Sequence, residues 1–211
     1  MRAVVFSTLL LLGAKCAPAA DEALAYSLKW PTGVSMGKSA LKVTQGASRV
    51  EFTLDASLPG IPVTGTFSSR SDAAGCTTEF AKKYEFGFRK SSERTTINGA
   101  KARRETMEGG KSVADVGACA KDGLLFLQFL RTELMAGRKP AGGKLLFGAQ
   151  YTVALEYPKS TNPAADTVKV NVKGPASQNS FEIDFLRDAA RTPASVRVPL
   201  AMGKFVLELV R

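Results

Sequence analysis

A single long apolar segment, Asp122 to Gly137, constrains this chain most, because it is the only convincing helix among patterns that otherwise indicate strands. Its apolar residues cover far more than one stripe of a helix: Leu124, Leu125, Phe126, Leu127, Phe129, Leu130, Leu134 and Met135. An ordinary surface helix buries one face only. This helix therefore requires cover on nearly all sides.

Both ends of the segment carry signals that bound a helix. The carboxylate of Asp122 can accept hydrogen bonds from the first free N–H groups, and Gly137 can adopt the left-handed conformation that ends the last turn. At about 1.5 Å per residue the helix is roughly 22 Å long, too short in its apolar part to span a bilayer. We expect a buried helix at about 122–136 in the concave face of a curved sheet. The alternative is a mobile plug over a ligand cavity.

The rest of the sequence alternates apolar and polar residues in short runs separated by turn residues. The run from Leu24 to Trp30 has the two-residue period of a half-buried strand. Asn98-Gly99 is a strong hairpin signal. Tyr84, Phe86 and Phe88 are expected on one face of another strand.

These patterns predict about ten strands and one helix. We expect a mainly β (α+β) fold, in which a curved antiparallel sheet or half-barrel wraps the helix. No linker or internal repeat divides the chain, so residues 20–211 are expected to form a single β-rich domain.

The first 19 residues have the pattern of a secretory signal peptide. Arg2 precedes an apolar run centred on Leu9 to Leu12, and Ala17-Pro18-Ala19 offers small residues for cleavage. Cys16 leaves open a lipid-modified cysteine, although Lys15 before it does not fit that pattern. We predict export, to the periplasm or outside the cell, with no transmembrane segment in the mature chain.

The charge of the chain is strongly basic, with 29 Lys and Arg against 19 Asp and Glu and a net charge of +10. Loss of the signal peptide removes two basic residues and leaves +8. In an exported protein this excess favours an anionic lipid surface or an acidic partner over nucleic acid. A basic patch for anionic head groups could include Lys82, Lys83, Arg89 and Arg104; the interleaved acids leave a solvated sheet face as the alternative.

Two cysteines, Cys76 and Cys119, remain after export. An even pair in an oxidising compartment predicts one disulfide. It would close a loop of about 43 residues and tether the start of the helix to the strands before it. The C-x-x-C spacing typical of a redox-active pair is absent.

The order of several motifs resembles an exported bacterial family of unknown function, DUF3108, over about residues 24–211. The motifs are Tyr26-x-x-x-Trp30 with Gly33 and Gly37, Cys119-Ala120-Lys121-Asp122, Phe129-Leu130-Arg131, Phe147-Gly148-Ala149-x-Tyr151, Arg191-Thr192-Pro193 and Gly203 to Leu209. The resemblance implies location and architecture rather than an activity. The expected fold is also similar to the half-barrels of periplasmic lipoprotein carriers, a similarity that does not fix function.

The absence of histidine excludes Ser-His-Asp and Cys-His catalysis. With both cysteines expected in a disulfide, only carboxylates remain for zinc, and we predict no metal and no cofactor. A carboxylate-based hydrolase could use Glu182, Asp184 or Asp188. Strand alternation, however, puts Glu182 and Asp184 on a solvent-facing side. We therefore predict a non-enzymatic protein.

The main functional prediction is that the protein binds a lipid or other apolar ligand between the helix and the sheet. The candidate contacts are Trp30, Phe126, Phe129, Leu130 and Arg131. Trp30 could equally belong to the core, and Arg131, a lone cation in an apolar helix, needs an acidic partner or solvent. The alternative is a structural or assembly factor that meets an envelope protein through its surface and has no ligand cavity.

Overall fold

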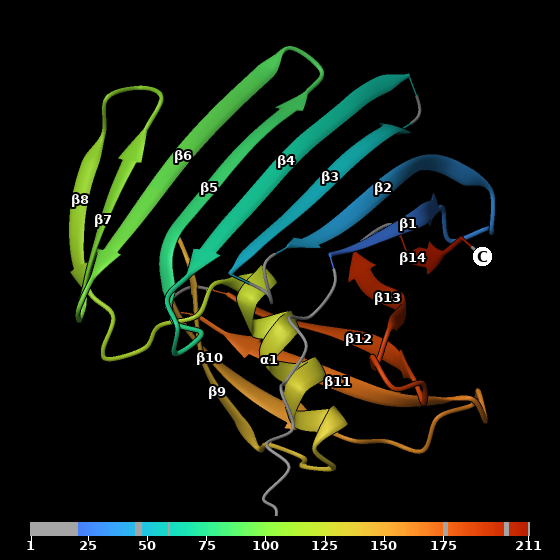
Figure 1. Cartoon of the computed structure of the whole chain (residues 1–211). Coiled ribbons are helices and arrows are strands. Elements are labelled where there is room, and N and C mark those ends of the chain that lie inside the picture. Colours follow the sequence, from blue (N-terminus) through green and yellow to red (C-terminus); the bar gives the residue numbers. More distant parts are fainter. Residues whose placement is uncertain (1–20, 45–47, 59, 175–176, 201–202, 211) are drawn as a thin grey trace, which may run out of the picture.

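A computed structural model describes residues 21–44, 48–58, 60–174, 177–200 and 203–210 (Figure 1). The first half of these residues forms β1 (Glu22–Lys29), β2 (Ser35–Thr44), β3 (Arg49–Leu58), β4 (Ile61–Ser71), β5 (Thr77–Phe86), β6 (Arg89–Asn98), β7 (Lys101–Thr106) and β8 (Lys111–Asp115). Then follow α1 (Gly123–Met135), β9 (Gly142–Phe147), β10 (Ala149–Glu156), β11 (Ala165–Lys173), β12 (Gln178–Leu186), β13 (Pro193–Leu200) and β14 (Gly203–Leu209). The predicted signal peptide, residues 1–19, lies outside the described residues.

The 14 described strands form one antiparallel sheet with β8 and β9 at its edges. Strands that follow one another in sequence are neighbours in the sheet, except across the helix, and β1 pairs with β14 to join the two halves. Figure 1 shows the sheet curving around α1, with β3–β6 extending well past its first turn. The predicted architecture, a curved antiparallel sheet around one helix, is confirmed.

The prediction of about ten strands is too low. All five residues of β8 are exposed, so no apolar period marks this strand in the sequence; its pairing with β7 alone defines it. β9 begins at Gly142-Gly143, a dipeptide that indicates a loop. Edge strands with little buried surface leave a weak sequence signal because packing, more than backbone preference, determines strand patterns.

Two turns test the predicted hairpins. The hairpin at Asn98-Gly99 is confirmed, with Gly99 in the β6–β7 turn at a φ of +59° that favours glycine. The position predicted for Phe88 is wrong. Phe86 pairs with Arg89, which leaves Gly87 and Phe88 in a two-residue turn, so Phe88 does not share the strand face of Tyr84 and Phe86.

The helix has the predicted ends. The Asp122 carboxylate caps it by accepting from the backbone N–H groups of Leu124 and Leu125. Ser69 and Thr77 donate hydroxyl hydrogen bonds to the same carboxylate, at 2.6 and 2.8 Å, and Asp122 has no exposed surface. A single side chain therefore terminates the helix and fixes it to β4 and β5.

Two walls of the sheet cover the helix. Phe126, Leu130 and Leu134 pack in the main core with β10, β11 and β12. On the other side, Leu125 packs in a second core with side chains of β1, β2 and β3. The expected cover on nearly all sides is confirmed except at Met135, which is 58% exposed, and it follows from the curvature of the sheet.

The β9 edge folds back toward β5, β6 and β7. The Phe147 ring lies 5.9 Å from the Phe80 ring, between centroids, and the Leu146 N–H donates to the carbonyl of Lys121 at 2.8 Å. Leu146 also joins a small cluster with Ala102 of β7. The curved sheet is thereby nearly closed beside the N-terminus of α1.

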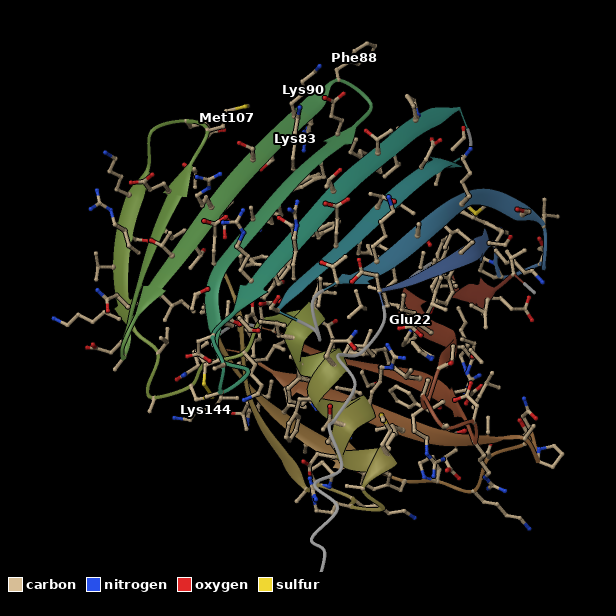
Figure 2. The ribbon with its side chains drawn as sticks, viewed as in Figure 1. Glu22, Lys83, Phe88, Lys90, Met107 and Lys144 are labelled. Atoms are coloured by element: carbon tan, nitrogen blue, oxygen red, sulfur yellow. A yellow bond between two sulfur atoms is a disulfide. The ribbon has the colours of Figure 1, made fainter. Side chains whose placement is uncertain are left out.

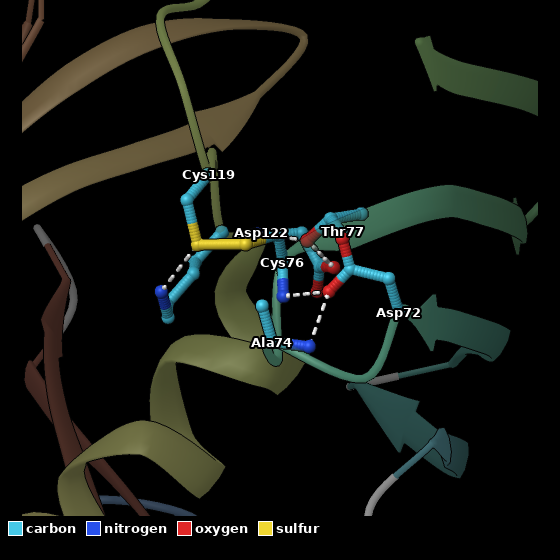
Figure 3. The surroundings of a disulfide bond; sticks show 7 residues. Asp72, Ala74, Cys76, Thr77, Cys119 and Asp122 are labelled. Atoms are coloured by element: carbon cyan, nitrogen blue, oxygen red, sulfur yellow. Dashed lines mark hydrogen bonds between the residues drawn. A yellow bond between two sulfur atoms is a disulfide. The ribbon is translucent and has the colours of Figure 1, made fainter. Parts of the chain in front are cut away.

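A disulfide joins Cys76 and Cys119 and confirms the predicted pairing (Figure 3). Beside it, the Thr77 N–H donates to the carbonyl of Ala120 at 2.9 Å. The Asp72 carboxylate accepts from two backbone N–H groups in the turn before β5. These contacts hold the segment before the helix against the start of β5.

Candidate functional site

Two of the predicted ligand contacts belong to the protein core. Phe126 and Leu130 are 6% and 1% exposed and pack with Val168, Ile183 and Phe185. The space between this side of the helix and the sheet is filled by side chains. A ligand there would have to displace the core.

Phe129 lies at the edge of the core and is half-buried. Together with Lys121, whose Nζ lies 5.4 Å from the centroid of the Phe129 ring, it lines two hollows of about 540 and 370 Å³. The larger is also lined by the β4–β5 turn and by Gln128, whose buried Nε2 has no hydrogen-bond partner among the described residues. Phe129 thus has open space beside it, and the buried Phe126 lines the smaller hollow as well.

Trp30 lies just after β1 and is half-buried. Its ring makes an edge-to-face contact with the ring of Phe205, with 4.9 Å between centroids. Phe205 belongs to β14, so Trp30 packs at the junction of the two halves of the sheet.

Arg131 forms the ion pair that its place in an apolar helix requires. It pairs with Glu22 of β1, with N···O distances of 2.6 and 2.9 Å. Nε and Nη2 also donate to the carbonyl of Ala190, and Nη1 donates to Gln128. A guanidinium has five N–H donors, and these contacts engage all of them.

The four predicted basic-patch residues divide between the two faces of the sheet. Lys82 and Arg104 point to the inner face, which we define as the face that contacts α1, because they alternate in phase with buried Phe80 and Ala102. Arg89 also points to the inner face, because on β6 it alternates in phase with Glu93, the residue that pairs with Lys82. Lys83 has the opposite phase and points outward.

Beyond the helix, part of the inner face lies open. The strand register brings together Leu54, Val63, Phe67, Tyr84, Phe86 and Arg89, which we call the open inner face. Leu54, Val63 and Phe67 are half-buried, whereas Tyr84 and Phe86 are 39% and 41% exposed. Gly65 lies among them, and a Cβ there would come within 3.1 Å of the Phe67 ring. The result is an apolar surface that starts at the core and ends at a cation.

A buried charge cluster borders this surface. Glu93 pairs with Lys82 at 3.2 Å and with Arg104 at 2.5 Å. Burial alone would raise the pKa of Glu93, but the hydrogen bond from Arg104 and the charge of Lys82 hold the pKa below its ordinary value. Lys82 and Arg104 thus share one carboxylate, whereas Arg89 has no ion pair within the described part of the chain. Arg89 is the inner-face cation best able to meet an anion.

The carboxylates proposed for a hydrolase are held by structural partners. Asp184 alternates with the core residues Ile183 and Phe185 as predicted, but it is buried rather than solvent-facing. Thr167 and Ser195 on the neighbouring strands and Arg197 surround it. Burial tends to raise the pKa of Asp184, but hydrogen bonds led by that of Arg197 lower it overall. Hydrogen bonds from Thr192 likewise outweigh burial and lower the pKa of Asp188. A general acid in glycoside hydrolysis requires a raised pKa.

The described residues include no group of three or more His, Cys, Asp or Glu side chains that could hold a metal ion. They also include no helix with the length and apolar character needed to cross a membrane.

Comparison with protein-family models and with curated proteins gives no match, so the resemblance to DUF3108 stays a prediction. Among solved structures, the chain is similar to a beta-barrel-like protein of domain of unknown function DUF1849 from Brucella abortus. That match has a TM-score of 0.62 and 10% identity and covers 90% of this chain and 95% of the other. It shows a barrel-like fold and nothing about activity. A DUF1089 family protein from Pseudomonas aeruginosa matches with a TM-score of 0.35 and 14% identity, covering 100% of this chain and 96% of that one.

Proposed function

We propose that this chain is an exported, non-enzymatic protein of the bacterial envelope that binds an anionic amphiphile on the open inner face. The acyl chain would lie on Leu54, Phe67 and Tyr84, and the head group would meet Arg89. The ligand class is thus a fatty acid or a phospholipid.

The observation that carries this proposal is the apolar inner face beyond the helix, which ends at Arg89, a cation with no ion pair among the described residues. Soluble proteins rarely leave contiguous apolar surface uncovered unless it serves binding. Tyr84 and Phe86 are large side chains that stay 39% and 41% exposed in the described chain. The neighbouring Arg89 makes an anionic head group the complementary partner.

The site differs from the one that the helix sequence indicates. Phe126 and Leu130 contribute to stability, and a ligand on the open inner face would reach the helix only near its first turn. The hollow beside Phe129 is a second space for an apolar group, but it lies at the opposite end of β5 from Arg89.

A substitution on the open inner face tests the proposal. With cis-parinaric acid as a fluorescent ligand, we expect Tyr84→Asp to raise Kd at least about tenfold, because the acyl chain would have to desolvate a carboxylate. Phe86→Asp, at a more terminal position of β5, should have the same effect.

The matched control is Thr66→Asp, which adds the same charge on the outer face of β4, opposite Lys83. Its Kd should stay within about twofold of the wild type. Circular dichroism would verify that all three variants are folded. Equal affinity of the wild type and both inner-face variants would contradict the proposal.

One observation favours the alternative function of an assembly factor. β8 is an exposed edge strand with a free backbone edge, and it carries an exposed apolar side chain, Val113. Such an edge can accept a strand from a partner protein. In that case the parinaric acid assay would show no binding by the wild type.

A further inference from the structure

The turn between β5 and β6 carries an aromatic ring, that of Phe88, which the described residues leave uncovered. Phe88 is fully exposed, and Figure 2 shows it beyond the end of the β5–β6 hairpin, on the side of the molecule away from α1. Gly87, with a φ of +58°, forms the turn with it. A fully exposed phenyl ring at the end of a hairpin adds no buried apolar area to the folded protein.

Further apolar side chains lie beside this ring. The Gly87 N–H donates to the carbonyl of Pro62 at 2.9 Å, which joins the β5–β6 turn to the start of β4. A Cβ at Gly87 would lie 3.4 Å from Cγ2 of Ile61, so Ile61 adjoins the turn. Ile61 and Phe86 are 39% and 41% exposed. Together with Phe88 they form what we call the apolar tip.

The charges around the apolar tip are mainly positive. Residues 83–90 include three cations, Lys83, Arg89 and Lys90, against one carboxylate, Glu85. Glu85 pairs with Lys90 at 3.3 Å. Lys83 and Arg89 have no ion pair within the described part of the chain. Figure 2 shows Lys83 and Lys90 near the same end of the hairpin as Phe88.

We propose that the apolar tip docks on an anionic phospholipid bilayer, with Phe88 inserted at the interface and the cations against lipid phosphates. An aromatic ring is favoured at the boundary between water and acyl chains, and each nearby cation adds attraction to an anionic surface. A stable protein interface buries roughly 800 Å² on each partner, far more than three side chains on a turn can supply. A membrane requires only a protruding apolar end with complementary charge.

This inference does not rest on the proposed ligand, because it depends on Phe88, which lies outside the open inner face. Phe86 and Arg89 belong to both surfaces. The two sites are nevertheless adjacent: Arg89 lies at the end of the open inner face and beside the apolar tip. Docking would thus present the open end of that face to the bilayer.

Vesicle binding tests the inference. The protein, expressed as the whole chain and purified from the periplasm without detergent, would be sedimented with vesicles of equal parts phosphatidylcholine and phosphatidylglycerol. We expect Phe88→Ser to reduce the partition coefficient at least about tenfold, because burial of even half a phenyl ring supplies more than that ratio requires. Phosphatidylcholine vesicles should bind the wild type at least about tenfold more weakly than the mixed vesicles.

The matched control is Met135→Ser at the C-terminal end of α1, where the side chain is 58% exposed. It should bind vesicles as the wild type does. In a second pair, emission from Phe88→Trp should shift to shorter wavelength on the mixed vesicles, whereas that from Met135→Trp should not.

Wild-type affinity in Phe88→Ser, no binding of the wild type to mixed vesicles, or no shift in Phe88→Trp would overturn the inference. Tyr84→Asp should retain vesicle binding while losing parinaric acid. Failure of the two proposals is therefore distinguishable.

Discussion

Asp122→Ala should lower the free energy of unfolding by roughly 3–5 kcal/mol, the largest effect we expect from a single substitution. Loss of a helix N-cap costs about 1 kcal/mol. The change also leaves the buried hydroxyls of Ser69 and Thr77 without their acceptor, at about 1–3 kcal/mol for each unsatisfied group. Burial raises the pKa of Asp122 in spite of four hydrogen bonds. Desolvation of the carboxylate therefore offsets part of the stability that these hydrogen bonds supply.

Urea denaturation would measure this loss, with Asp72→Ala as the control. Asp72 also accepts two backbone N–H hydrogen bonds, but it is exposed and orders only its own turn. Its removal should cost about 1 kcal/mol. If Asp122→Ala were no more destabilising than Asp72→Ala, the role of Asp122 in fixing the helix to β4 and β5 would be wrong.

Removal of the disulfide is the second large effect. Cys76 and Cys119 are 43 residues apart, and in the chain-entropy model closing such a loop stabilises a protein by about 4 kcal/mol. We expect the double variant Cys76→Ser, Cys119→Ser to unfold at a correspondingly lower urea concentration. Stability is lost mainly because the unfolded chain gains conformational entropy when the segment between Cys76 and Cys119 is no longer closed into a loop.

A reductant supplies the control for this prediction. The wild type in dithiothreitol should match the double variant, and the double variant itself should not respond to dithiothreitol. A loss below about 1 kcal/mol would show that the unfolded chain keeps the two segments together without the bond.

The sequence predicts those parts of the fold that depend on neighbouring residues or on a covalent bond. Asp122 is the N-cap, and Gly137, with a φ of +71°, follows the C-cap Ala136. Both ends are predictable because capping involves only neighbouring residues. The cysteine pair follows from its number and from the expected compartment. β8 could not be predicted, because a strand exposed on both faces has no period.

The candidate site could be predicted only in part, because it depends on pairing between distant strands. Alternation alone separates Lys82 from Lys83, but it does not say which of the two faces the helix. The register that groups Leu54 with Tyr84 has no local signal. Phe126 and Phe129 look alike in the sequence, and only the position of the sheet makes one core and the other half-exposed.

The signal that could have identified the open inner face is the strand pattern of β5. On the inner face of β5, Tyr84 and Phe86 resume the apolar pattern of Phe80 after Lys82, beyond the length of sheet that one helix can cover. At about 3.3 Å per residue a ten-residue strand is roughly 33 Å long, whereas a helix with its side chains is about 10 Å wide. A strand whose apolar residues extend past the helix that covers it indicates a binding surface.

The most direct test of the central claim is native mass spectrometry of the protein purified from the periplasm without detergent. We predict the mass of residues 20–211 together with a reproducible added mass of lipid size, and loss of that addition in Tyr84→Asp. A bare protein mass that stays unchanged after incubation with envelope lipids would contradict the account. The exposed edge of β8 would then become the surface to study.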